Sequence, residues 1–178
     1  MKKKFLLSVI LLVVIVVGAI FAFKQYIRPS ENLTMDYSSI NIEEKLKHIV
    51  SSLKSEVRLT EQDIDALIKQ NMDQQLNSYT YINGAQFYIE NDVLYATLNV
   101  TLYDKLDAEI RATYHLNWNG SQLELSPQSL SVKDISLPIS WLEKITIPIY
   151  DPSDSLITIS SLINEGREII IKLKLSLF

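Results

Sequence analysis

The side chains of this chain that could do chemistry are few and far apart. Its two histidines are His48 and His115, and neither has a second histidine, a cysteine or a carboxylate at metal-ligand spacing. The chain has no cysteine, which excludes disulfides and thiol chemistry. We therefore predict no metal site and no cofactor, and we expect both histidines at the surface.

Two short patterns are compatible with a hydrolase. Ser51-Ser52-Leu53-Lys54 contains S-x-x-K, which acylating serine enzymes combine with further boxes that this sequence lacks. Asp107 and Glu109 are two residues apart and could form an acid pair, but Arg111 continues the same strand face, as in a solvated charged stripe. No G-x-S-x-G, Walker A or H-E-x-x-H motif is present. We expect no catalytic residue and a protein that is not an enzyme.

The first apolar run of the chain predicts where the protein lies relative to the membrane. Phe5–Phe23 is 19 residues long and uncharged, and as a helix it would span about 28 Å, close to a hydrocarbon core of about 30 Å. It is longer than a signal-peptide core and ends in bulky residues, which favours a retained anchor over a cleaved signal. Lys2–Lys4 in front of it predict a cytoplasmic N-terminus and an extracellular C-terminal domain in the cell membrane.

The remaining chain suits one domain. We predict a cytoplasmic tip and transmembrane anchor over 1–28, a linker over 29–40 and an extracytoplasmic domain over 41–178. Without Lys2–Lys4, 14 basic residues remain against 21 acidic ones, a net charge of −7. Because this acidic domain has no basic cluster, we exclude nucleic acid as a partner.

Two amphipathic helices are expected outside the membrane. Asn41 is a predicted N-cap for a helix that ends near Ser55, with Ile42, Leu46, Ile49, Val50 and Leu53 on one face. Thr60–Asp63 resembles a capping box, and the apolar spacing after it predicts a helix over 61–77. The short alternation Val57–Leu59 lies between the two helices.

From Tyr79 onward the apolar period changes from 3.6 to 2, which predicts strands. Turn signals occur at Asn83-Gly84, Asn91-Asp92, Asp104-Lys105 and Asn119-Gly120. One face of 106–118 is apolar, and the other, which includes Asp107, Glu109 and Arg111, is expected to be solvated. A slip in strand register is expected near Lys133-Asp134, a short helix over 140–145, and a last strand over 168–178. The predicted fold is α+β: two helices packed on a long, curved antiparallel meander behind a single N-terminal transmembrane helix.

Such a fold could enclose an apolar groove between its helices and its sheet. Small residues on the long apolar strand faces would leave room for a ligand, although they could equally admit the helices closely. Aromatic residues crowd the first half of the sheet, where core packing is the simpler interpretation. The candidate groove residues are Ile64, Leu67, Ile68, Leu94, Ala96, Leu98, Ile110 and Ala112.

The order of these features resembles the YpmS-like family of bacterial membrane-anchored proteins of unknown function. The resemblance rests on the single N-terminal span, on Val57-Arg58-Leu59-Thr60 leading into a helix, and on the alternating run 123–138 that ends in Leu137-Pro138. Lys133 replaces a glycine that often follows the valine in that family. The resemblance implies a location in the cell envelope and supplies no catalytic residue.

Two functions follow as hypotheses. The first is a non-enzymatic envelope protein whose outer domain binds an apolar or amphipathic ligand, such as a membrane lipid or a lipid-linked precursor. The alternative is an accessory subunit that binds another membrane or envelope protein. An enclosed cavity would favour the first hypothesis, and a stoichiometric protein partner the second.

Overall fold

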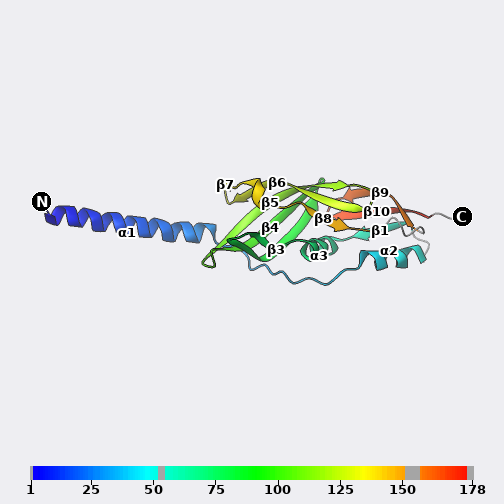
Figure 1. Ribbon diagram of the computed structural model, residues 1–178, viewed down its shortest axis with the longest axis horizontal. Coiled ribbons are helices and arrows are strands. Elements are labelled where there is room, and N and C mark those ends of the chain that lie inside the picture. The colour runs from blue at the N-terminus through cyan, green and yellow to red at the C-terminus, as the bar shows by residue number, and fades with distance from the viewer. Residues whose placement is uncertain (1, 52–54, 151–156, 176–178) are drawn as a thin grey trace.

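The N-terminal span is a long helix that projects from a compact domain in the computed structural model (Figure 1). The structure describes residues 2–51, 55–150 and 157–175. Helix α1 (Lys2–Ile27) contains the predicted apolar run and extends four residues beyond it. Within the described residues, one helix, Lys3–Ile27, is long and apolar enough to cross a membrane, and the mean hydropathy of its 18-residue apolar stretch is 3.2. The N-terminus and the end of the last strand lie at opposite ends of the molecule.

The larger of two sheets is antiparallel and strongly curled, as a half-barrel. Its strand order is β2-β3-β4-β5-β6-β7, and β8 pairs with the end of β6 that β7 leaves free. The strands are β2 (Gln75–Asn77), β3 (Thr80–Glu90), β4 (Val93–Leu102), β5 (Leu106–Trp118), β6 (Gln122–Val132), β7 (Ile135–Ser136) and β8 (Ile145–Pro148). The long meander predicted from the period-2 pattern is its central part.

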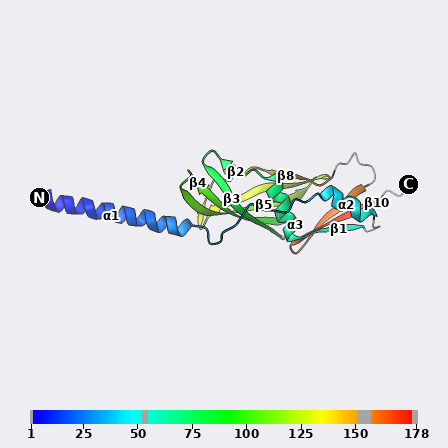
Figure 2. The ribbon, with the colours of Figure 1, turned by 90° about the horizontal axis from the view of Figure 1, so that it is seen from below.

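A second, three-stranded sheet continues the domain away from α1 (Figures 1 and 2). It consists of β1 (Glu56–Leu59), β10 (Glu168–Leu175) and β9 (Ile157–Glu165), with β10 in the middle. The predicted meander did not include this second sheet, in which β1 pairs with β10, more than a hundred residues later, rather than with its neighbours in sequence. The predicted last strand is confirmed as far as Leu175, and 176–178 lie outside the described residues.

The two predicted helices cover different sheets. Helix α2 (Ile42–Ser51) packs on β1, and the Asn41 carboxamide accepts the Glu44 amide at 3.1 Å, as its predicted N-cap role requires. Helix α3 (Glu61–Asn71) contacts β1, β3 and β8 and so joins the two sheets. The last three residues of the predicted apolar face are Ile49, Val50 and Leu53, and their side chains are outside the described structure.

Helix α3 is shorter than the predicted 61–77. Its capping box is confirmed, since Thr60 accepts the Asp63 amide and Asp63 accepts the Thr60 amide. The helix ends because Met72 adopts an extended conformation with ψ of 151°. The next residues then pair with β3, where the Ile82 amide donates to the Gln74 carbonyl at 2.8 Å. Sheet pairing therefore overrides the helical spacing of the last apolar residues.

Three of the four predicted turns are confirmed. The backbone enters the left-handed region at Asn91 and Asp92, at Tyr103 and Asp104, and at Gly120. The prediction at Asn83-Gly84 was wrong, because this pair lies inside β3, at an irregularity in its pairing with β4.

The segment after β6 also differs from its prediction. A tight turn with Lys133 at φ of 50° reverses the chain into β7, where a slip in register was expected. The predicted short helix over 140–145 is reduced to a 3-10 turn, η1 (Ile139–Trp141), and β8 begins at Ile145.

One hydrophobic core runs through both sheets and α3. The inward faces of β4 and β5 are buried as the alternation predicted, and Phe87 is among the largest fully buried side chains. The α+β class with one N-terminal apolar helix is confirmed. The two sheets, and α3 between them, fix the position of the domain's surfaces.

Candidate functional site

The eight residues predicted to line an apolar groove are all in the hydrophobic core. None of their side chains is more than 4% exposed, and they pack against one another from α3, β4 and β5. Leu67 alone also borders a hollow, of about 650 Å³, that opens beside Ser39 and Pro148. The small side chains of Ala96 and Ala112 therefore accommodate close packing within this core.

A larger hollow lies elsewhere, under the segment that joins α1 to α2. We call residues 28–41 the connector. Its extended chain crosses the edge of β3, where the Ala85 amide donates to the Thr34 carbonyl at 3.3 Å. Gly84 permits this crossing, because a Cβ at that position would overlap the backbone carbonyl of Leu33. The irregularity in β3 thus marks the point where a second backbone approaches.

The connector also covers part of the outer face of the sheet. Glu109, predicted to be solvated, is 2% exposed and accepts hydrogen bonds from both the amide (3.0 Å) and the hydroxyl of Ser30. Asn99, directly opposite Glu109 on β4, donates to the Glu31 carbonyl at 2.7 Å. The prediction of a solvated face was wrong at Glu109, because this carboxylate faces the connector rather than water.

Glu109 is charged in its covered position. Burial raises the pKa of the Glu109 carboxyl, but the hydrogen bonds from Ser30 and Arg111 and the charge of Lys133 outweigh burial, so the pKa lies below its ordinary value. Arg111 donates from Nη2 at 3.0 Å, and the Lys133 ammonium lies 3.9 Å away. The carboxylate therefore holds the connector on the sheet and is not available as one of a pair of catalytic acids.

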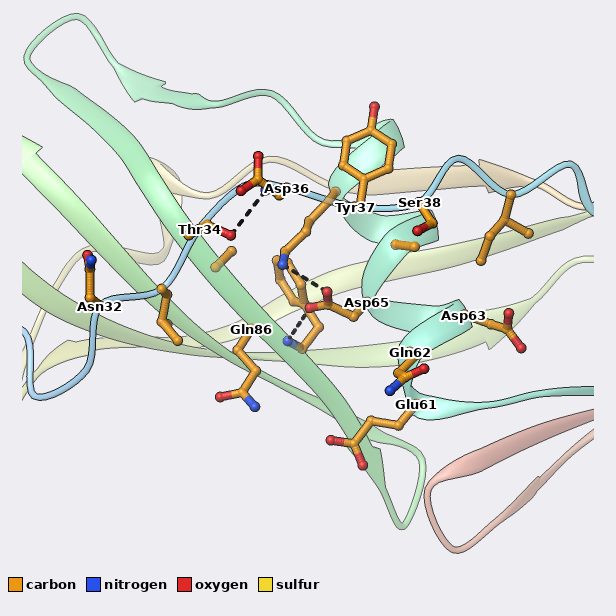
Figure 3. A pocket seen from close by; sticks show the side chains of 16 residues that line it. Asn32, Thr34, Asp36, Tyr37, Ser38, Glu61, Gln62, Asp63, Asp65 and Gln86 are labelled. Carbon is orange, nitrogen blue, oxygen red and sulfur yellow. Dashed lines mark hydrogen bonds and ion pairs between the residues drawn. The ribbon is translucent and has the colours of Figure 1, made fainter.

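An open cleft of about 1070 Å³ separates the middle of the connector from α3 and β3 (Figure 3). Its rim is polar: in Figure 3, Asn32, Asp36, Tyr37 and Ser38 come from the connector, Gln62 from α3 and Gln86 from β3. About half of the lining is apolar and comes from side chains that include Leu33, Ile40 and Phe87. The cleft thus offers amides, hydroxyls and carboxylates, with an aromatic ring beside them.

An ion pair forms the floor of this cleft. The Lys69 side chain is 7% exposed, and its ammonium lies 2.8 Å from the Asp65 carboxylate, one helical turn earlier. The other Asp65 oxygen accepts the Phe87 amide at 3.0 Å and so satisfies the free edge of β3. Asp65 therefore ties α3 to β3 and keeps Lys69 in place, and both residues are structural elements of the cleft.

Most of the acidic side chains of the cleft have a cation. Asp63 binds Lys45 at 2.8 Å, and Glu61 binds Arg167 at 3.1 Å. Partial burial raises the pKa of Asp63, but the hydrogen bonds from Lys45 and Thr60 outweigh it and bring the pKa below its ordinary value. Among the described residues, only the Asp36 carboxylate in the cleft lacks a cationic partner. The cleft is nearly neutral and suits an uncharged polar group more than an anion.

The histidines and carboxylates that the sequence offered for metal binding or catalysis do not form a common site among the described residues. His48 on α2 and His115 on β5 are both exposed, as predicted. The side chains of Ser51 and Ser52 and all of Lys54 lie outside the described structure. Asp107 accepts the Thr101 hydroxyl at 2.7 Å, two positions from the covered Glu109. No group of three or more metal-ligating His, Cys, Asp or Glu side chains occurs in the part of the chain that the structure describes.

Residues 29–40 were predicted only as a linker, and neither the packing of the connector on the sheet nor the cleft was predicted. Two signals for the connector were present: a glycine inside an otherwise regular strand, and Asn99 and Glu109 in register on neighbouring strands. No signal marked the cleft, whose lining comes from three separate segments. In comparisons with known proteins, no family model, curated protein or solved structure matches this chain, so the resemblance to the YpmS-like family stays a prediction.

Proposed function

We propose that this protein is a non-enzymatic, membrane-anchored envelope protein whose outer domain binds an amphipathic ligand, namely the polar part of a lipid-linked precursor. In this proposal α1 stays in the cell membrane as a single-pass anchor, with Lys2–Lys4 on the cytoplasmic side and the domain outside the cell. The resemblance to the YpmS-like family is compatible with this location.

The cleft under the connector is the observation that carries the proposal. Its volume of about 1070 Å³ is at the upper end of ordinary ligand pockets. Amide groups such as those of Gln62 and Gln86 can both donate and accept hydrogen bonds, as a hydroxylated or amide-containing ligand requires. Because the candidate apolar groove residues are packed in the core, the acyl part of the ligand would remain in the bilayer.

The height of the cleft favours a lipid with a long polar part. Ala85 and Gln86 are five and six residues along β3 from its first residue, Thr80, and β3 starts at the end of the domain near α1 (Figure 2). At about 3.3 Å per residue this is a distance of roughly 17–20 Å. A headgroup layer is only about 5–7 Å thick on each side of a bilayer. A simple phospholipid would therefore not reach the cleft, whereas a precursor with several polar units would.

Native mass spectrometry of the full chain, extracted in mild detergent from its own membranes, tests this function. We expect a co-purifying lipid-linked adduct on the wild type, and its loss in the double variant Gln62→Ala/Gln86→Ala. Both side chains are exposed, so the fold should persist. Gln128→Ala, another exposed strand glutamine on β6, is the matched control and should keep the adduct. A folded wild type without any adduct, or an adduct that survives the double variant, would contradict the proposal.

The alternative function, an accessory subunit for another envelope protein, is favoured by the outer edge of β9. This strand is nine residues long and pairs with β10 on one side, and no described strand pairs with its other side. Ile163 on it is exposed, and an open edge can accept a strand of a partner. Crosslinking from an introduced Ser160→Cys in cells would give one stoichiometric protein adduct in this case, and Ser129→Cys on β6 would not.

A further inference from the structure

The C-terminal end of helix α1 is packed against the domain. Its last residue, Ile27, is 3% exposed and belongs to the hydrophobic core. The Tyr26 hydroxyl donates to Asp134 in the β6–β7 turn at 3.0 Å, and Ser30, three residues beyond Ile27, is held by Glu109. These contacts on both sides of the helix end fix the domain relative to α1.

Exposed aromatic side chains gather at the end of the domain that α1 enters. The β2–β3 and β4–β5 turns meet there, with the Tyr103 amide bonded to the Tyr79 carbonyl at 2.8 Å. The β6–β7 turn lies at the same end of the domain (Figure 1). The rings of Tyr79 and Tyr103 stack with centroids 4.9 Å apart, yet the two residues are 61% and 66% exposed. Ile135, the first residue of β7, is exposed, and the exposed Asp104 and Lys105 follow Tyr103.

The length of α1 determines how far this end is from a bilayer. If Phe5–Phe23 fills the hydrocarbon core, Ile27 is four residues further along the helix, or about 6 Å. The headgroup layer on each side is about 5–7 Å thick. Because Ile27 is already buried in the domain, the turns around it must lie within or against the headgroups.

We propose that Tyr79, Tyr103, Ile135 and Lys105 form a surface that contacts the headgroup layer of the bilayer. This inference rests on the membrane anchoring in the proposed function and is independent of the ligand in the cleft. Tyrosine suits this position because its ring packs against acyl chains and glycerol while its hydroxyl stays hydrated. Lys105 is exposed two residues after Tyr103, and its ammonium can donate hydrogen bonds to lipid phosphates. The domain is thereby held upright, with the cleft at a set height.

Because the chain has no cysteine, single introduced cysteines allow a direct test. Lys105→Cys and Glu90→Cys are exposed positions beside similar tight turns at opposite ends of the β3–β4–β5 sheet, about 30 Å apart along β4. The full chain, labelled with a fluorophore at one of them, is inserted in phosphatidylcholine–phosphatidylglycerol nanodiscs that contain a headgroup-nitroxide lipid. We expect the label at 105 to lose most of its emission and the label at 90 to lose none.

A pair of double variants tests the tyrosines themselves. Tyr79→Ser/Tyr103→Ser should reduce the quenching of the label at 105. Tyr88→Ser/Tyr95→Ser removes the other stacked pair, whose ring centroids are 5.1 Å apart at the far end of β3 and β4, and should leave the quenching unchanged. Equal quenching at 105 and 90, or no effect of either double variant, would overturn the headgroup contact. Protease protection of α1 in the same nanodiscs separates these results from a failure of anchoring, in which α1 would be cleaved.

Discussion

The buried Glu109 carboxylate makes the strongest prediction, because it joins the connector to the sheet. Glu109→Gln retains the shape of the side chain and one acceptor oxygen but removes the charge and places an NH2 group where the carboxylate accepted hydrogen bonds. Hydrogen bonds to a charged group contribute about 1.5–3 kcal/mol each. Arg111 is mostly exposed, so its ion pair with Glu109 contributes little. The two bonds from Ser30 therefore dominate. Both go to Oε2, which the glutamine oxygen can replace as a neutral acceptor of roughly half the strength, so we expect the free energy of unfolding to fall by about 2–3 kcal/mol.

The assay is unfolding of the full chain in detergent micelles, followed by the fluorescence of Trp118 and Trp141. For a domain of this size, about 2–4 °C of Tm corresponds to 1 kcal/mol, so the variant should melt about 5–10 °C lower. Glu90→Gln is the matched control: Glu90 is exposed and has no hydrogen-bond or ion-pair partner among the described residues, so its change should stay within about 0.5 kcal/mol. A glutamyl-specific protease should also cleave after Glu31 faster in Glu109→Gln, since the connector is less firmly held.

The pH dependence of stability, compared between the wild type and Glu109→Gln, gives a second, independent test. The folded-state pKa of Glu109 lies below its ordinary value, so the stability that its charge contributes is present above the unfolded pKa and is lost as the pH falls through the folded one. The difference between wild type and Glu109→Gln should therefore be largest near neutral pH and disappear in acid. A difference that is constant with pH, or no larger than that of Glu90→Gln, would refute the role assigned to this carboxylate.

Three further predictions concern other positions. Gly84→Ala should lower the free energy of unfolding by at least about 2 kcal/mol in urea denaturation, because its Cβ would overlap the Leu33 carbonyl, whereas Gly18→Ala, which meets nothing within 4 Å, should not change the stability of the domain. Thr60→Ala removes the capping box of α3 and should cost about 1 kcal/mol, measured as a lower Tm. Burial raises the pKa of Tyr114 to about 12, so the wild type should lose about 2–3 kcal/mol between pH 10 and 12, as the unfolded state ionises first, and Tyr114→Phe should lose less in alkaline unfolding.

The parts of the fold that local physics decides could be predicted from the sequence. The apolar run of α1, the capping box at Thr60 and the alternation along β4 and β5 each depend on residues close together in the chain, and each is confirmed. The pairing of β1 with β10 could not be predicted, because alternation shows that a strand exists but not its partner. The end of α3 was missed because the helical spacing does not show that Gln74 pairs with Ile82 of β3, and this pairing stops the helix.

The connector shows why the candidate site could not be found by periodicity. An extended polar segment has no hydrophobic period, so residues 29–40 were expected only to link the anchor to the domain. The information about their position is instead carried by the surface that they cover. A strand face meant for water has no need for a glycine such as Gly84 or for a carboxylate within reach of a serine such as Ser30. Gly84 and the carboxylate of Glu109 both cost stability unless a second chain segment lies against them. In a sheet protein, polar residues in register with no evident partner are therefore evidence for a covering segment, and here that segment forms one wall of the cleft.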